Sequence, residues 1–175
     1  SAAVLMKRKS FGPSLLKVPE DGSLADYEDA LDRHYYAEAR EALRTAKGAP
    51  ARILAKQFAA EIDHRNIANI LEASAVGIGR EQLVSLLIPG GSLIPRRAFA
   101  AIANGGEEAM IDLLRSSKSF DIAGFEHVLS DTKATRSLDP VITWLKTREA
   151  GMMPRISYLH PVSAQPILHY LATKV

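Results

Sequence analysis

The sequence predicts an all-α fold. Three observations lead to this class: apolar residues recur at helical spacing over several long stretches, no stretch alternates as a β-strand does, and glycine or proline residues separate the periodic stretches. The 175 residues are 47% hydrophobic and 24% charged, which is the composition of a globular chain. We therefore expect helices that bury their apolar faces against one another.

The first long helix is predicted to begin at Leu24. Apolar residues such as Leu31 and Tyr35 follow it at a period of 3.6 residues, and Ser23 with Asp26 resembles a capping box in which Asp replaces Glu. This helix should end near Gly48-Ala49-Pro50, where glycine and proline interrupt the pattern.

A second helix is predicted over residues 51–76 and a third over 80–87, because Gly77 and Pro89-Gly90-Gly91 follow them. We interpret these glycines as helix terminators rather than phosphate-binding loops, since no strand precedes them. Shorter helices are predicted, in chain order, at residues 95–103, 107–117, 122–130, 138–149 and 163–174. Pro166 is compatible with the first turn of the last one.

The chain contains a colinear internal repeat. The tripeptide Lys-Ser-Phe occurs twice, an aromatic residue followed by Glu occurs later in each copy, and an Ile-Leu pair occurs later still. The matching positions are 9–11 and 118–120, Tyr27-Glu28 and Phe125-Glu126, and Ile67 with Leu71 and Ile167 with Leu171. A unit of about 100 residues that recurs in this way indicates pseudo-symmetric stacking of helical units.

This repeat divides the chain into three segments. Residues 1–22 are predicted to be the tail of a preceding repeat with a loop, residues 23–105 one helical repeat, and residues 106–175 a second repeat truncated at its C-terminus. We expect residues 24–80 and 122–175 to superpose.

The sequence lacks the residues that several kinds of catalytic and metal-binding site require. There is no cysteine, no two of the five histidines have the i, i+4 spacing of a helical metal site, and no serine lies in a G-x-S-x-G setting. The net charge is only +2, and the short run Lys7-Arg8-Lys9 is typical of a solvated helix face, so we expect no nucleic-acid partner. No apolar run is long enough to span a membrane. We expect no catalytic residue, metal or cofactor.

Asp63 and Asn66 are the most informative polar residues, because a helical wheel places both on an apolar face. Buried polar groups need partners, so we expect them to hydrogen-bond, for example to a neighbouring helix end, with catalysis as the alternative for Asp63. Glu28 and Glu126, which recur in the two copies, have the same two interpretations, and their repetition favours architecture. The opposite face of the same helix should meet solvent or a partner, through His64, Arg65, Asn69 and Glu72.

Five stretches resemble the C subunit of archaeal A-type and bacterial V-type ATP synthases, the family that includes the d subunit of the eukaryotic vacuolar proton pump. They are DYEDALDRHYY (26–36), EIDHRNIANIL (61–71), LLIPGG (86–91), FDIAGFEHVL (120–129) and HPVSAQPILHYLATKV (160–175), in the order of that family. Two positions depart from it. Glu72 stands where the family typically has Arg, and the chain ends at Val175 where family members continue, which suggests a fragment.

The resemblance implies a funnel-like stack of three similar helical domains, about two of which are present here. It also implies a function: a non-catalytic rotor subunit, peripheral to the cytoplasmic side of the membrane, that couples the D and F subunits of the central stalk to the proteolipid rotor ring. Pumping of protons or sodium ions and ATP turnover would belong to other subunits. Two further classes stay open, a generic helical scaffold for protein binding and a helical enzyme whose site needs another segment.

Overall fold

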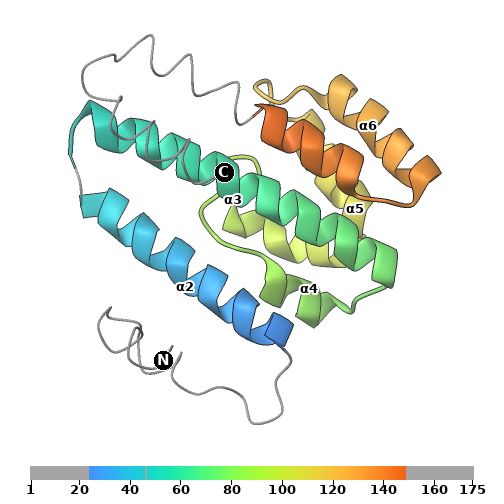
Figure 1. Ribbon diagram of the computed structural model, residues 1–175, viewed down its shortest axis with the longest axis horizontal. Coiled ribbons are helices and arrows are strands. Elements are labelled where there is room, and N and C mark those ends of the chain that lie inside the picture. The colour runs from blue at the N-terminus through green and yellow to red at the C-terminus, as the bar shows by residue number, and fades with distance from the viewer. Residues whose placement is uncertain (1–23, 46, 149–175) are drawn as a thin grey trace. The chain divides into compact units, whose positions relative to one another are not determined.

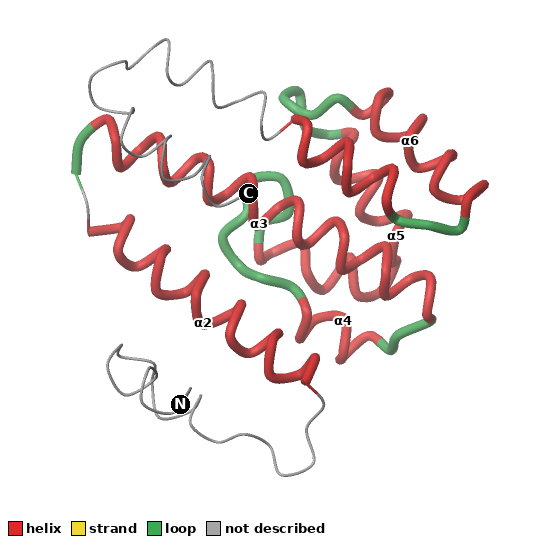
Figure 2. Tube along the Cα trace, in the orientation of Figure 1, coloured by secondary structure: helices red, strands yellow, loops and turns green. Residues whose placement is uncertain are grey.

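The computed structural model describes residues 24–45 and 47–148, and these contain only helices, turns and loops. Figure 2 shows every described segment as helix or loop. The all-α class predicted from the sequence is confirmed. Contacts divide the chain into two compact units, one containing α2 (Leu24–Thr45) and the other everything from α3 onward (Figure 1).

α2 begins and ends close to the predicted positions. Its last turn is held by a salt bridge between Arg44 Nη2 and Glu41 Oε1 at 2.7 Å, a pair three residues apart on the exposed surface. Such exposed pairs add little to the stability of a helix, so the pair supports the helix end without determining the fold.

The second unit is arranged around α3 (Ala49–Val76), the longest helix described. Pro50 lies in its first turn, and Gly77 ends it in the left-handed conformation with φ 73°. The Gly77 and Ile78 amides both donate to the Ala73 carbonyl, which satisfies a backbone acceptor at the helix end. Gly77, which the sequence predicted to end the helix, therefore does so by adopting the left-handed conformation.

Five more helical segments follow α3 among the residues up to 148. They are α4 (Arg80–Leu86), the 3₁₀ turn η2 (Arg96–Ala98), α5 (Phe99–Arg115), α6 (Ile122–Thr135) and a helix at residues 139–148. α5 packs on α3, α4 and η2. Asp121 caps α6 by accepting a hydrogen bond from the Gly124 amide.

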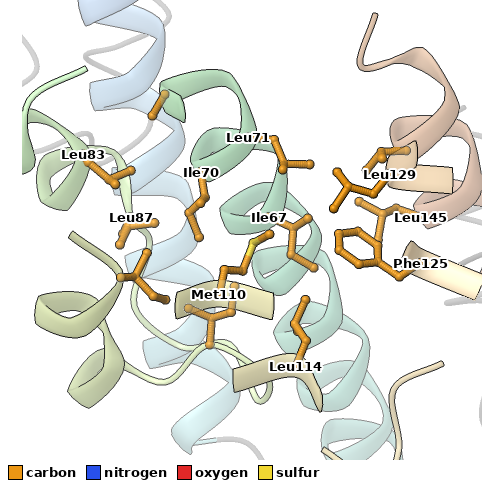
Figure 3. Close-up of a cluster of buried hydrophobic side chains, with 14 of the residues drawn as sticks. Ile67, Ile70, Leu71, Leu83, Leu87, Met110, Leu114, Phe125, Leu129 and Leu145 are labelled. Carbon is orange, nitrogen blue, oxygen red and sulfur yellow. The ribbon is translucent and has the colours of Figure 1, made fainter. Parts of the chain in front are cut away.

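One hydrophobic core connects these helices. Figure 3 shows Ile67, Ile70 and Leu71 of α3 among side chains from the helices around them. The buried members are Ile67, Ile70, Leu71, Ala73, Leu83, Leu87, Ile94, Phe99, Ile102, Met110, Leu114, Phe125, Leu129, Val141 and Leu145. Because α3 supplies consecutive turns of side chains to this cluster, it is the helix on which the unit is assembled.

Phe120, the last residue of the second Lys-Ser-Phe phrase, connects α6 to the helix at residues 139–148. Its ring makes edge contacts with Phe125 at 5.5 Å and Trp144 at 5.8 Å between centroids. Arg148 lies over the Trp144 ring and also pairs with Asp121 at 3.1 Å. Aromatic pairs of this kind add about 0.5–1.5 kcal/mol each beyond burial, so this junction is tightly held.

The sequence predicted separate helices at residues 95–103 and 107–117, and the structure joins them across a kink in α5. At the kink, Gly106 has φ 57° and ψ −136°, a backbone conformation open essentially only to glycine. The bend lets Phe99 and Ile102 on one side and Met110 and Leu114 on the other all be buried in the same core.

The predicted repeat remains a prediction. Its second copy extends through residues 149–175, and these, together with the predicted helix at 163–174 and the cluster at residues 7–9, lie outside the described residues.

We expect Gly106→Ala to destabilise the fold by about 1–3 kcal/mol, because alanine cannot adopt its backbone conformation without strain. Gly79→Ala is the control, since Gly79 has φ −66° and open space around it, and should cost less than about 0.5 kcal/mol. Urea unfolding midpoints compare the two; equal shifts would show that the kink is not required.

Candidate functional site

Three polar side chains of α3 lie one turn apart along the helix: Asp63, Asn66 and Asn69. We call them the α3 polar row. Asp63 and Asn66 have 1% and 0% of their surface exposed, and Asn69 is half-buried. Residues three apart on a helix are neighbours on its surface, so the row presents a line of donors and acceptors along α3. All three bind the backbone of residues 86–94, which we call the 86–94 segment.

The Asp63 carboxylate accepts three backbone N–H groups. Oδ2 accepts from Ser92 at 2.8 Å and Leu93 at 2.9 Å, and Oδ1 accepts from Ile94 at 2.9 Å. These amides belong to consecutive residues of a loop that leads from α4 to η2. Because buried amides without a partner are costly, the carboxylate replaces the pairing that a helix or sheet would have supplied.

Asn66 binds both backbone groups of a single residue. Its Nδ2 donates to the Ile88 carbonyl and its Oδ1 accepts from the Ile88 amide, each at 2.8 Å. Asn69 Nδ2 donates at 2.9 Å to the carbonyl of Leu86, the last residue of α4. The last carbonyls of a helix have no partner within it, so Asn69 caps α4 while Asn66 holds the chain that leaves it.

Gly91 allows the close approach between this loop and α3. A Cβ atom built there would overlap Asp63 Oδ1 and lie 2.8 Å from its Cγ. Its neighbour Gly90 has φ 127°, which a side-chain-bearing residue rarely adopts. The glycine pair that the sequence analysis interpreted as ending a helix therefore has a second role, which is to admit the buried carboxylate.

Burial raises the pKa of the Asp63 carboxyl above its ordinary value, and the amides of Leu93, Ile94 and Ser92 oppose that shift, with a smaller contribution from His64. The ionised form therefore depends on the three amide donors for its stability in this place. Both carboxylate oxygens thus accept from backbone amides, which places the side chain to hold the loop.

The predicted partner face divides between two environments. Arg65 and Glu72 are exposed, and His64 is half-buried. Asn69, which the sequence analysis placed with them, points instead to the 86–94 segment together with Asp63 and Asn66. Asn69 lies seven residues, nearly two full turns, after Ile62, which is buried. This spacing places the two residues on the same side of α3, and it is the sequence pattern that could have predicted the inward position of Asn69.

The remaining predicted motif residues lie away from the α3 polar row in sequence. Glu28 lies in α2, and Pro166 is outside the described residues. Glu126 lies on α6 and accepts from Arg115 Nη2 at 2.6 Å and Nε at 3.0 Å on the surface. Arg115 also binds Asp112, which lies on α5 as it does. Its pairing with Glu126 therefore connects the end of α5 to α6.

Within residues 24–45 and 47–148, no three His, Asp or Glu side chains are grouped closely enough to hold a metal ion. In the same part of the chain, no helix combines the length and the apolar character that crossing a membrane requires.

We expect Asp63→Ala to destabilise the protein by about 1–3 kcal/mol, because it removes the acceptor of three amides. Glu72→Ala, on the exposed face of the same helix, should cost less than about 0.5 kcal/mol. Denaturant midpoints of the two variants test this, and equal shifts would refute the assignment of the faces.

A double-mutant cycle tests the contact between Gly91 and Asp63. Gly91→Ala alone should destabilise by about 2–4 kcal/mol, since its methyl group displaces the carboxylate. In the Asp63→Ala background the space is free, so the same change should cost at least about 1 kcal/mol less. Additive costs in the two backgrounds would contradict a direct contact.

Comparison with known proteins gives a consistent identification. The model of the family described as the ATP synthase (C/AC39) subunit matches residues 5–175. No solved structure matches the chain significantly.

Three of the relatives illustrate the similarity. The C subunit of the A-type ATP synthase of Haloferax volcanii is 29% identical over 171 residues, covering 94% of this chain and 47% of that protein. The protein of the same name from Methanosarcina mazei is 26% identical over 171 residues, covering 97% and 45%, and that of Pyrococcus furiosus is 26% identical over 155 residues, covering 87% and 40%. The chain thus spans about half the length of the curated relatives it matches. With the family model matched along nearly its whole length, the chain belongs to the ATP synthase (C/AC39) subunit family.

Proposed function

We propose that this chain acts as part of a non-catalytic rotor subunit of an A/V-type ATP synthase, coupling the central stalk to the proteolipid ring of the membrane. Family membership supports this proposal, as do relatives named as the C subunit of A-type ATP synthases. The partners would be the D and F subunits of the central stalk at one end of the helical stack and the ring at the other. The chain would then lie peripherally on the cytoplasmic side of the membrane.

The observation that carries the proposal is that the Asp63 carboxylate binds backbone amides. Among the side chains that the structure describes, it is the one acidic group that is buried, and both its oxygens bind backbone amides of the 86–94 segment. A general acid or base must instead reach a substrate proton. The strongest candidate for chemistry in the sequence is thus engaged in holding the fold, as expected of an adaptor.

Transmission of torque makes a mechanical demand that this arrangement suits. Rotation loads an adaptor sideways, so its surfaces must keep their positions under force. The α3 polar row fixes the 86–94 segment with six hydrogen bonds, three to Asp63, two to Asn66 and one to Asn69. Interfaces on the order of 1,000 Å² or more would be needed to hold partners without slipping.

Part of such an interface would come from the exposed side of α3. Arg65 and Glu72 are exposed there, with His64 half-buried beside them. Asn69 would contribute indirectly, by holding the end of α4 through Leu86. A generic helical scaffold for other proteins is the competing interpretation, and co-purification with rotor subunits distinguishes the two.

Calorimetric titration tests the proposal. We expect the purified chain to bind the D–F stalk complex saturably and to give no saturable heat with ATP, because the coupling function requires the first and not the second. An unrelated helical protein of similar charge serves as the control. Saturable ATP binding or turnover by the chain would contradict the non-catalytic role. If the chain binds neither the stalk complex nor the ring, the coupling role is contradicted.

A further inference from the structure

The two arginines of η2, Arg96 and Arg97, form a small positive patch. Both are exposed, and they are the only charged residues between positions 86 and 104. Within residues 24–45 and 47–148, neither makes a salt bridge, whereas Arg44, Arg115 and Arg148 each pair with a carboxylate. Both guanidinium groups therefore have donors that no carboxylate of the described residues occupies, and an external anion can accept from them.

The backbone that carries the patch is fixed on both sides. Before it, Asp63 holds the amides of Ser92 to Ile94, and the Ile94 side chain is fully buried. After it, Phe99 is buried in the core, and the Ala98 amide closes the turn by donating to the Pro95 carbonyl at 2.8 Å. A partner would therefore order only the two side chains, and a small ordering cost favours binding.

The chemistry of the patch selects its partner. Arginine presents a planar fork of donors that matches a carboxylate in bidentate geometry and is enriched where protein surfaces bind tightly. Recognition of an anionic membrane typically uses clusters of about four to eight cations, and the stretch from residue 86 to residue 104 carries only these two.

We infer that Arg96 and Arg97, held by the Asp63-bound loop, are a docking site for a carboxylate-bearing surface of a partner protein. This inference rests on the proposed function, which makes the central stalk the partner in question. The α3 polar row then has a consequence at the surface: it sets the position from which the two guanidinium groups reach the partner.

The test is calorimetric titration of the D–F stalk complex with Arg96→Gln/Arg97→Gln. We expect affinity to fall about tenfold, which is typical of losing close charge pairs at an interface, with an unchanged unfolding midpoint. Arg52→Gln/Lys56→Gln is the matched control, because it removes two exposed charges near the start of α3. It should leave the affinity within about twofold of wild type.

Three outcomes would overturn the inference in distinguishable ways. If wild type binds and the Arg96/Arg97 variant binds equally well, the docking site is wrong while the proposed function stands. If wild type binds neither the stalk complex nor the ring, the proposed function fails and the inference fails with it. If wild type binds phosphatidylserine vesicles and the variant does not, the patch recognises lipid phosphate rather than a protein carboxylate.

Discussion

The hydrogen bonds from Ser92, Leu93 and Ile94 to the Asp63 carboxylate are the interaction on which the rest of the unit depends. The 86–94 segment has no helix of its own between α4 and η2, yet Leu87, Ile88 and Ile94 are buried in it. Burial of apolar side chains takes backbone amides out of water with them, and those amides then need acceptors. α3 supplies the acceptors from its side chains, so the loop can be buried as tightly as a regular element.

This solution links the polar and apolar sides of the same helix. Asp63 and Asn66 alternate along α3 with Ile67, Ile70 and Leu71, which belong to the core. The loop that the polar row holds also delivers Ile94 to that core and leads directly into η2 and α5. Displacement of the carboxylate would therefore disturb both hydrogen bonding and packing. Such coupling between hydrogen bonding and packing is what the rotor role proposed for this member of the ATP synthase (C/AC39) subunit family would require.

Sequence patterns predicted the helices and part of the site, and the misses have physical causes. Glycine and proline signals placed the ends of α3 and α4 well, because left-handed and proline-containing turns have local sequence requirements. The wheel placed Asp63 and Asn66 on the buried face but put Asn69 outside, because that residue lies at the edge of the buried arc and gains its partner from a distant segment. The contact of Gly91 with Asp63 joins residues 28 positions apart (91 − 63), and no local pattern encodes it.

The Asp63 carboxylate holds the 86–94 segment in place, and backbone hydrogen exchange measures this most directly. In the wild-type chain, the amides of Ser92, Leu93 and Ile94 should exchange slowly, since each donates to a buried carboxylate. In Asp63→Ala the exchange of these three amides should accelerate much more than that of the amides of the core residues Ile67 and Ile70. The ratio of the two accelerations should be at least about ten. Equal protection of the three loop amides in wild type and variant, after correction for global stability, would contradict the account.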